Sequence, residues 1–240
     1  MLKKIEGFSK LSKAEKINWI TEMHFEEATK AREILSIYNH PNEEVQQRHD
    51  EFIENSIANY YLPLGLAPNF IINGEAYTLP MAIEESSVVA AACKAAKFWS
   101  SRGGFKTHII GTQKIGQVHF LFFGKIAALK SFFNAKKQDL IDSTASLTAN
   151  MKKRGGGIID IELKDKTNLI ENYHQLHLTF DTVDSMGANF INSCLEQVAK
   201  TLQSLAENDE VFLKEQHAIE VIMSILSNFV PQCLVQAEVR

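Results

Sequence analysis

The chain has 240 residues, of which 45% are hydrophobic and 22% charged, and its formal net charge is −4. The length allows one large domain or two small ones, and the mild charge supplies no basic field for nucleic acid or an anionic membrane. No apolar run approaches the roughly 20 residues that cross a bilayer, and the polar start lacks the apolar segment of a secretory signal.

The three cysteines, Cys93, Cys194 and Cys233, are widely separated, and none has a Cys-x-x-Cys spacing. An odd number of scattered cysteines indicates reduced thiols rather than disulfides or a metal cage. We therefore expect a cytoplasmic protein without a zinc site.

The first hundred residues predict helices, then a hairpin, then another helix. Ser12–Glu15 has the spacing of a capping box at a helix start. Further helices are expected over 25–38 and 43–55. Asn73-Gly74 lies between two apolar stretches and predicts a hairpin turn, because both residues tolerate positive φ. An alanine-rich helix is expected over 87–98.

The composition changes at 100–104, and we place a domain boundary shortly after it. The elements expected next are strands over 106–111 and 117–123, a helix over 125–148, strands over 158–163 and 174–182, and a helix over 189–206. This order predicts a small α+β layer structure with an antiparallel sheet and helices on one face. Residues 217–228 fit a helix or a mixture of strand and helix, and 233–239 alternates like a strand.

The segment Glu84-Glu85-Ser86-Ser87 precedes the alanine-rich helix. One interpretation is an N-terminal cap, since acidic groups favour this end of the helix dipole and serine accepts from free amides. The alternative makes one glutamate a general acid, which requires burial to raise its pKa. The local pattern leaves both open.

A second polar segment, Asp184–Asn189, follows a strand with alternating apolar residues and precedes a helix. Gly187 allows a tight turn, and the helix start offers unpaired amides to an anion. A plain strand-turn-helix corner is the alternative. The run Lys152–Gly157 is interpreted as a solvated loop.

The eight histidines show no metal-ligand pattern. His174 and His177 lie three apart on an expected strand, so their side chains point to opposite faces. His119 and His217 are interpreted as ordinary, partly buried residues. We predict no metal site and no catalytic histidine.

Four segments together resemble the class II (bacterial, soluble) type of 3-hydroxy-3-methylglutaryl-CoA reductase. They are Glu54–Ala58, Leu62–Ala67, Ile83–Ala92 and Asp184–Phe190. Ala58 and Ser86 stand where the family has glycine and proline, and Ser185 where it has alanine. These residues are small, so we interpret the changes as tolerated.

The resemblance implies roles for eleven residues. Glu85 matches the catalytic glutamate of the family. Substrate contacts are implied for Glu54, Asn55, Leu64, Gly65 and Ser87. Cofactor contacts are implied for Asp184, Met186, Gly187, Asn189 and, through the segment Ser227-Asn228, for Asn228.

The resemblance also implies the fold. A large mixed helical and β substrate domain of the α+β class is interrupted by a small antiparallel-sheet cofactor domain that is not a Rossmann fold. We expect the first part of the large domain over 1–110, for acyl-CoA binding and dimerisation. The NAD(P)-binding domain is expected over 111–215, and a truncated return to the large domain over 216–240.

The implied reaction is the two-step reduction of hydroxymethylglutaryl-CoA to mevalonate and CoA, or its reverse, with NADPH or NADH. NADH-preferring relatives carry an acidic residue shortly before the glycines, where this chain has Thr148–Asn150 followed by the cations of Lys152–Arg154. We therefore expect a preference for NADPH. A homodimer or a higher oligomer is implied, with no nucleic-acid or membrane partner.

The family's catalytic lysine, aspartate and C-terminal histidine lie beyond the segments matched here. We therefore expect this chain to be inactive by itself, as the N-terminal portion of a reductase. Two alternatives stay open: a non-catalytic fragment that binds CoA or a dinucleotide, and one half of a split enzyme. No Gly-x-Ser-x-Gly elbow or phosphate loop points to another enzyme class.

Overall fold

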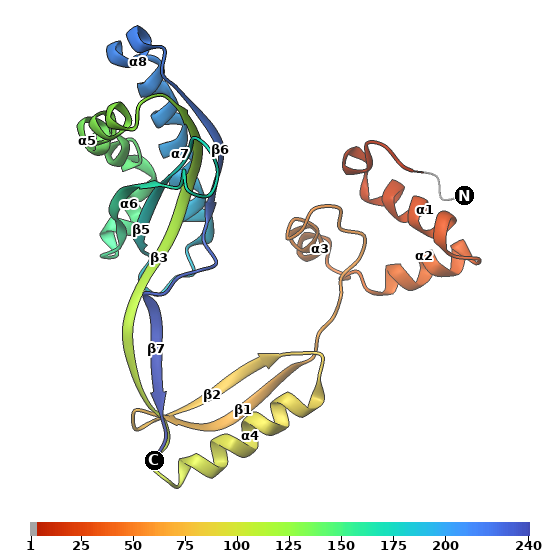
Figure 1. Ribbon diagram of the computed structural model, residues 1–240. Coiled ribbons are helices and arrows are strands. Elements are labelled where there is room, and N and C mark those ends of the chain that lie inside the picture. The colour runs from red at the N-terminus through yellow and green to blue at the C-terminus, as the bar shows by residue number, and fades with distance from the viewer. Residues whose placement is uncertain (1–3) are drawn as a thin grey trace. The chain divides into compact units, whose positions relative to one another are not determined.

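The computed structural model describes residues 4–240, so the start of the polar N-terminal segment, Met1–Lys3, lies outside the described residues. The chain divides into two compact units (Figure 1). Unit 1 takes the described residues up to Gly104 with Arg240, and unit 2 takes Phe105–Val239. Both contain helices and antiparallel strands, which confirms the α+β class. None of the helices between residues 4 and 240 is long and apolar enough to span a membrane.

Unit 1 begins with short helices. They are a 3-10 turn at Phe8–Lys10, α1 at Lys13–His24, α2 at Ala28–Ile37 and α3 at Glu43–Asp50. The predicted capping box is present: the Ser12 amide donates to Glu15 Oε2 at 2.7 Å, and Ser12 Oγ accepts from the Glu15 amide at 3.3 Å. Helix α3 is shorter than predicted, ending at Asp50.

A hairpin and one helix complete unit 1. Strands β1 (Leu64–Ile72) and β2 (Glu75–Ala82) pair antiparallel through the predicted turn, where Asn73 and Gly74 have φ of 52° and 91°. Helix α4 (Ser86–Ser100) packs against β1, and Ala67 and Ala96 are fully buried.

The sheet of unit 2 has the order β4-β5-β3-β6, with β7 paired to the first part of β3. Its strands are β3 at Lys106–Phe123, β4 at Gly157–Asp165, β5 at Tyr173–Asp181, β6 at Ala218–Leu226 and β7 at Cys233–Glu238. All pairings are antiparallel. Within residues 217–228, for which the sequence left a helix open, Ala218–Leu226 form β6 because they pair with β3.

The prediction of two separate strands over 106–111 and 117–123 is wrong. A single strand, β3, runs through both ranges. Residues 106–112 pair with β7, and residues 113–123 then pair with β5 and β6. Different partners thus hold the two parts extended, and no turn is needed between them.

Helices α5 (Ile126–Asp142), α6 (Ala145–Lys153) and α7 (Ala188–Glu207) pack on one face of this sheet, and α8 (Glu210–Glu215) follows α7 (Figure 1). The single helix predicted over 125–148 is two helices. Between them, Ser143 and Thr144 donate from their hydroxyls to the carbonyls of Leu140 and Ile141, a local bond that competes with helix continuation.

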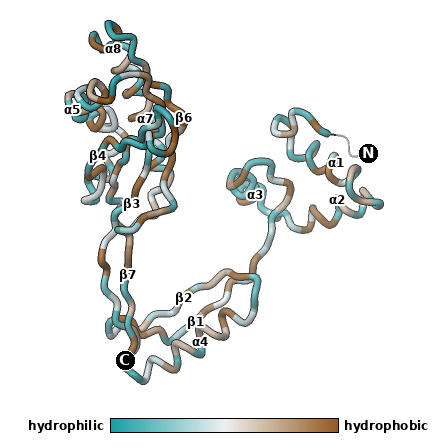
Figure 2. Tube along the Cα trace, in the orientation of Figure 1, coloured by the Kyte–Doolittle hydropathy of each residue, from teal (hydrophilic) through white to brown (hydrophobic). Residues whose placement is uncertain are grey.

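The core of the protein lies in unit 2. The side chains of Val118, Phe120 and Phe122 on β3 and of Leu176, Leu178 and Phe180 on β5 are buried against α5 and α7. In unit 1 the only buried apolar residues among those described are Ala31, Ala67 and Ala96. Hydrophobic residues nevertheless occur along both units (Figure 2).

We expect unit 2 to exchange its amide hydrogens far more slowly than unit 1. Burial of large apolar side chains is the main source of stability, and unit 1 buries only alanines completely. Hydrogen exchange followed by mass spectrometry should show β3 and β5 protected at least about tenfold longer than β1, β2 and α1. Equal protection of the two units would contradict this expectation.

Candidate functional site

Glu85 lies at the N-cap position of α4, with φ −108° and ψ 122°. Its carboxylate accepts a hydrogen bond from Ser87 Oγ, and both residues are exposed. The expected serine cap is absent, because no side chain caps α4 and Ser86 is already the first helical residue. The Glu85 carboxylate is therefore hydrogen-bonded to the Ser87 hydroxyl rather than to the amides of the helix.

Leu64 and Gly65 lie at the start of β1, beside the first turn of α4. A Cβ placed on Gly65 would lie 3.4 Å from the Val89 side chain, so the strand and the helix approach closely here. This contact brings Gly65 close to the helix turn that carries Glu85 and Ser87. Leu64 is 71% exposed.

Glu54 and Asn55 lie in the segment between α3 and β1. Both are exposed, and Asn55 has a left-handed backbone with φ 58°. Within residues 4–240, no hydrogen bond or ion pair joins either of them to Glu85 or Ser87. Their predicted role as substrate contacts stays a prediction.

The segment after β5 forms the tight turn expected from the sequence. Val183 has φ 55°, and Gly187 has φ 72° and is the N-cap residue of α7. A Cβ on Gly187 would lie 2.5 Å from Thr182 Cγ2, so only glycine fits. Asp184, Met186 and Asn189 are exposed around this turn.

Hydrogen bonds within the segment fix the turn. Asp181 Oδ1 accepts from the Val183 amide at 2.8 Å. The Thr182 carbonyl accepts from the Ser185 amide at 3.0 Å and from Ser185 Oγ at 2.7 Å. The backbone of residues 181–187, which we name the α7 turn, is therefore held in one shape while its outer side chains stay accessible.

Two cations contact the α7 turn, one from the basic run Lys152–Arg154 and one, Lys114, that the sequence did not indicate. Arg154, from the loop between α6 and β4, donates to Asp184 Oδ1. Lys114 Nζ, from β3, donates to Thr182 Oγ1 at 2.6 Å and to the Ser185 carbonyl at 2.8 Å. The basic glycine loop and the α7 turn, 30 residues apart in sequence, thus form one surface.

The segment after β6 reaches the same end of α7. The Ser227 amide donates to the Ile115 carbonyl at 2.9 Å, and the Leu226 amide donates to Asn192 Oδ1 at 2.9 Å. Asn192 lies one turn beyond Asn189 on α7. Asn228, next along the chain, is exposed. The structure therefore gathers the predicted cofactor residues of unit 2 around the start of α7.

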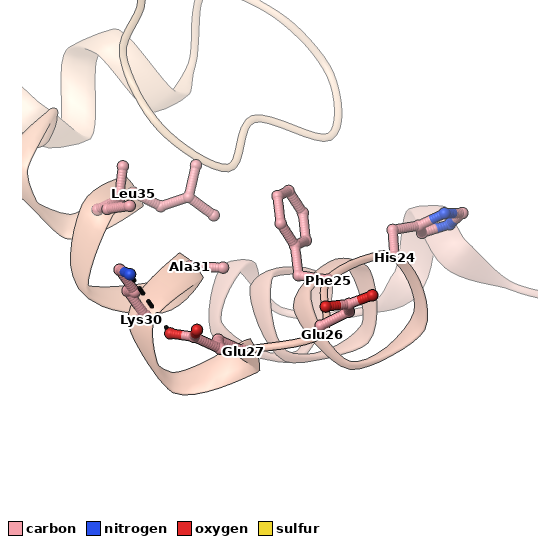
Figure 3. A pocket seen from close by; sticks show the side chains of 8 residues that line it. His24, Phe25, Glu26, Glu27, Lys30, Ala31 and Leu35 are labelled. Atoms are coloured by element: carbon pink, nitrogen blue, oxygen red, sulfur yellow. Dashed lines mark ion pairs between the residues drawn. The ribbon is translucent and has the colours of Figure 1, made fainter.

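Unit 1 also contains a hollow that is lined by a different set of residues. It encloses about 430 Å³ at the corner between α1 and α2 (Figure 3). Its lining residues are His24, Phe25, Glu26, Glu27, Lys30, Ala31, Ile34 and Leu35. Lys30 and Glu27 form an ion pair across its rim at 3.4 Å. None of the predicted substrate or cofactor residues lines this hollow.

His174 and His177 of β5 face opposite sides of the sheet, as predicted. His174 is 2% exposed and lies among the core residues, with its ring centroid 5.8 Å from that of Phe120. His177 lies on the other face, and burial lowers the pKa of both side chains. Among residues 4–240, no three His, Cys, Asp or Glu side chains form a group that could hold a metal ion.

We expect unit 2 to lose stability as the pH falls below about 6.5, because burial lowers the pKa of His174 from that ordinary value. The unfolded chain then binds a proton before the folded chain does, so stability present above pH 6.5 is lost on acidification. The midpoint of thermal unfolding should drop between pH 7.5 and pH 5.5. It should drop less in His174→Gln, and an identical pH dependence in this variant would contradict the expectation.

Comparison with known proteins decides the family. The family model of hydroxymethylglutaryl-coenzyme A reductase matches residues 12–240. The chain belongs to this family. The 3-hydroxy-3-methylglutaryl-coenzyme A reductase of Archaeoglobus fulgidus is 34% identical over 89% of this chain and 48% of its own length. A probable reductase of Borreliella burgdorferi is 31% identical over 83% of this chain and 42% of its own.

Solved reductase structures agree with the fold. A reductase of Streptococcus pneumoniae matches 98% of this chain and 52% of its own, with a TM-score of 0.64 and 28% identity. A class II reductase of the same organism, bound to NADPH in open conformations, covers 98% of this chain and 59% of its own, with a TM-score of 0.62 and 28% identity. The chain spans about half the length of the curated reductases that it matches.

Proposed function

We propose that this chain supplies the acyl-CoA-binding and dinucleotide-binding parts of a hydroxymethylglutaryl-CoA reductase. The complete enzyme would interconvert hydroxymethylglutaryl-CoA with mevalonate and CoA, using two equivalents of NAD(P)H in the reductive direction. The observation that supports the proposal best is the α7 turn. It joins the family motif Asp184–Asn189 to a glycine-capped helix start and a cationic loop in one surface of unit 2.

The residues around the α7 turn fit a dinucleotide. Gly187 keeps the start of α7 free of a side chain, so its amides can donate to a phosphate. Gly156 lets the basic loop approach β5, because a Cβ there would lie 2.5 Å from the Asp181 carbonyl oxygen. Asp184, Met186, Asn189 and Asn228 would contact the bound cofactor. When bound, the dihydronicotinamide of the cofactor would supply the hydride.

Glu85 would donate the proton to the substrate oxygen as negative charge develops on it. Ser87, which donates to Glu85, would orient the carboxylate and contact the substrate. A general acid needs an enclosed environment, and Glu85 is exposed in unit 1. We therefore propose that the enclosure comes from bound substrate and from the half of the family sequence that this chain does not match.

We propose that NADPH is preferred over NADH. Arg154, which ends the basic run Lys152–Arg154, contacts Asp184 of the α7 turn. Thr148 is buried within α6, and none of Thr148, Ala149 and Asn150 is acidic, so this segment supplies no carboxylate to bind a ribose hydroxyl or repel a 2′-phosphate. A 2′-phosphate would gain charge-assisted bonds from these cations.

Binding and turnover measurements test the proposal separately. Titration of the purified chain with NADPH and NADH should give binding of both, with NADPH at least about fivefold tighter. The 340 nm assay with hydroxymethylglutaryl-CoA should give no turnover until the unmatched half of the family sequence is supplied, as a longer chain or as a second polypeptide. A clear NADH preference would contradict the cofactor assignment. Turnover by the short chain alone would contradict the division of catalytic groups.

The chain covers 48% and 42% of the Archaeoglobus fulgidus and Borreliella burgdorferi reductases. A second candidate is that it binds CoA or a dinucleotide without turnover, or acts as half of a split enzyme. For the complete enzyme we propose the domain ranges 1–110, 111–215 and 216–240. We also propose a cytoplasmic homodimer, or a higher oligomer, whose partners are the substrates and cofactor rather than nucleic acid or membrane.

A further inference from the structure

Lys114 lies on β3 opposite Phe180 of β5 and is only partly exposed. Its ammonium donates to two acceptors of the α7 turn, Thr182 Oγ1 at 2.6 Å and the Ser185 carbonyl at 2.8 Å. Thr182 is itself fully buried, and its hydroxyl donates to the same Ser185 carbonyl at 2.7 Å. Lys114 therefore links Thr182, near the start of the turn, to Ser185 in its middle.

The charge of Lys114 has no acidic counterpart in these contacts. Both acceptors are neutral, and among the ion pairs within residues 4–240 none includes Lys114. Of the two acidic residues of the turn, Asp181 accepts from Thr112 Oγ1 and the Val183 amide, and Asp184 is paired with Arg154. Neither carboxylate contacts the Lys114 ammonium, so the charge of Lys114 adds a positive contribution to the field at the turn, and this contribution favours an anion there.

We infer that Lys114 is a positioning residue of the dinucleotide site, which rests on the proposed function. It would hold the α7 turn in the shape that exposes the start of α7, and its charge would attract the pyrophosphate of the cofactor without direct contact. The two effects can be separated, because the hydrogen bonds depend on the donor and the field depends on the charge alone.

Three variants at this position test the inference. Lys114→Met removes the donor and the charge, Lys114→Gln keeps a polar donor without charge, and Lys114→Arg keeps both. We expect dinucleotide affinity to fall about tenfold in the Met and Gln variants and less than about threefold in the Arg variant. The dependence of affinity on salt concentration should weaken in the Met and Gln variants and stay unchanged in the Arg variant.

Lys164→Met is the matched control. Lys164 lies on β4 and pairs in register with Gln175, six residues before the end of β5 at Asp181, so its loss makes the same change in net charge away from the turn. We expect wild-type affinity and salt dependence from this control. Equal weakening by Lys164→Met and Lys114→Met would show a general charge effect and overturn the inference.

Amide exchange at Val183 and Ser185 provides a readout that needs no cofactor. Both amides should exchange faster in Lys114→Met and recover in Lys114→Arg, whereas β5 amides stay unchanged. If the wild-type chain binds neither dinucleotide, the proposed function fails, while the exchange rates still decide whether Lys114 fixes the turn. Wild-type affinity in a folded Lys114→Met variant would overturn the inference alone. Should that variant not fold, the difference between Lys114→Gln and Lys114→Arg decides in the same way.

Discussion

Replacing Glu85 by glutamine in a complete reductase that contains this chain is expected to lower kcat by about 10²–10⁴-fold. The amide cannot donate an acidic proton to the substrate oxygen, but it keeps the size of the side chain and can still accept from Ser87 Oγ. Because Glu85 is exposed at the start of α4, the fold of unit 1 should be unaffected. The rate of NADPH oxidation at 340 nm with saturating substrate measures the effect.

Glu84→Gln is the natural control for this experiment. Glu84 is the preceding residue, is also exposed and has the same charge. It should retain turnover within about threefold of wild type, because proton transfer depends on the position of one carboxyl group. A Glu85→Gln enzyme with full activity, or equal losses in both variants, would refute the assignment of Glu85. Dinucleotide affinity should be unchanged in both, since the α7 turn belongs to unit 2.

Gly187→Ala is expected to destabilise unit 2 by roughly 2–5 kcal/mol and to abolish measurable dinucleotide binding. The residue has φ 72°, which an L side chain rarely adopts, and its new Cβ would lie 2.5 Å from Thr182 Cγ2. Thr182 is fully buried and carries the bonds to Lys114 and Ser185, so it cannot move aside freely. Chemical denaturation and titration with NADPH measure the two losses.

Two further variants separate backbone strain from the clash. Gly155→Ala introduces the same kind of strain at φ 89° but meets nothing within 4 Å, so it should be destabilised less. Adding Thr182→Ser to Gly187→Ala removes the clashing methyl group and keeps the hydroxyl, which should recover part of the lost stability. No recovery in the double variant would mean that the methyl group is not the obstacle.

Sequence reasoning succeeded where the cause of the structure is local. The capping box at Ser12 and Glu15 depends on two hydrogen bonds between residues three apart. The hairpin at Asn73-Gly74 depends on φ preferences of two adjacent residues. The motif Asp184–Asn189 formed the tight turn expected of it for the same reason, and it is also part of the resemblance that identified the family.

The sequence predictions were wrong or ambiguous mainly where segments distant in the chain decide the local conformation. The strand β3 continues through residues 112–116 because β7, β5 and β6 supply its hydrogen bonds in turn. The apolar periodicity of residues 217–228 fitted a helix or a strand, and pairing with β3 made Ala218–Leu226 a strand. Ser143 and Thr144 ended a helix that apolar periodicity alone would have continued.

By itself, the sequence of this protein indicated its family and its α+β class, because short motifs and local periodicity carry that information. The resemblance to the family singled out Glu85 as the candidate acid, and this assignment stays a prediction. Only the tertiary structure decided which cations contact the α7 turn. Arg154 lies 30 residues from Asp184, and Lys114 lies 68 residues from Thr182, so their contacts arise from strand pairing and from the packing of α6 against the sheet. No spacing pattern encodes such contacts, because a charged side chain is compatible with many surface positions until the fold supplies its partner.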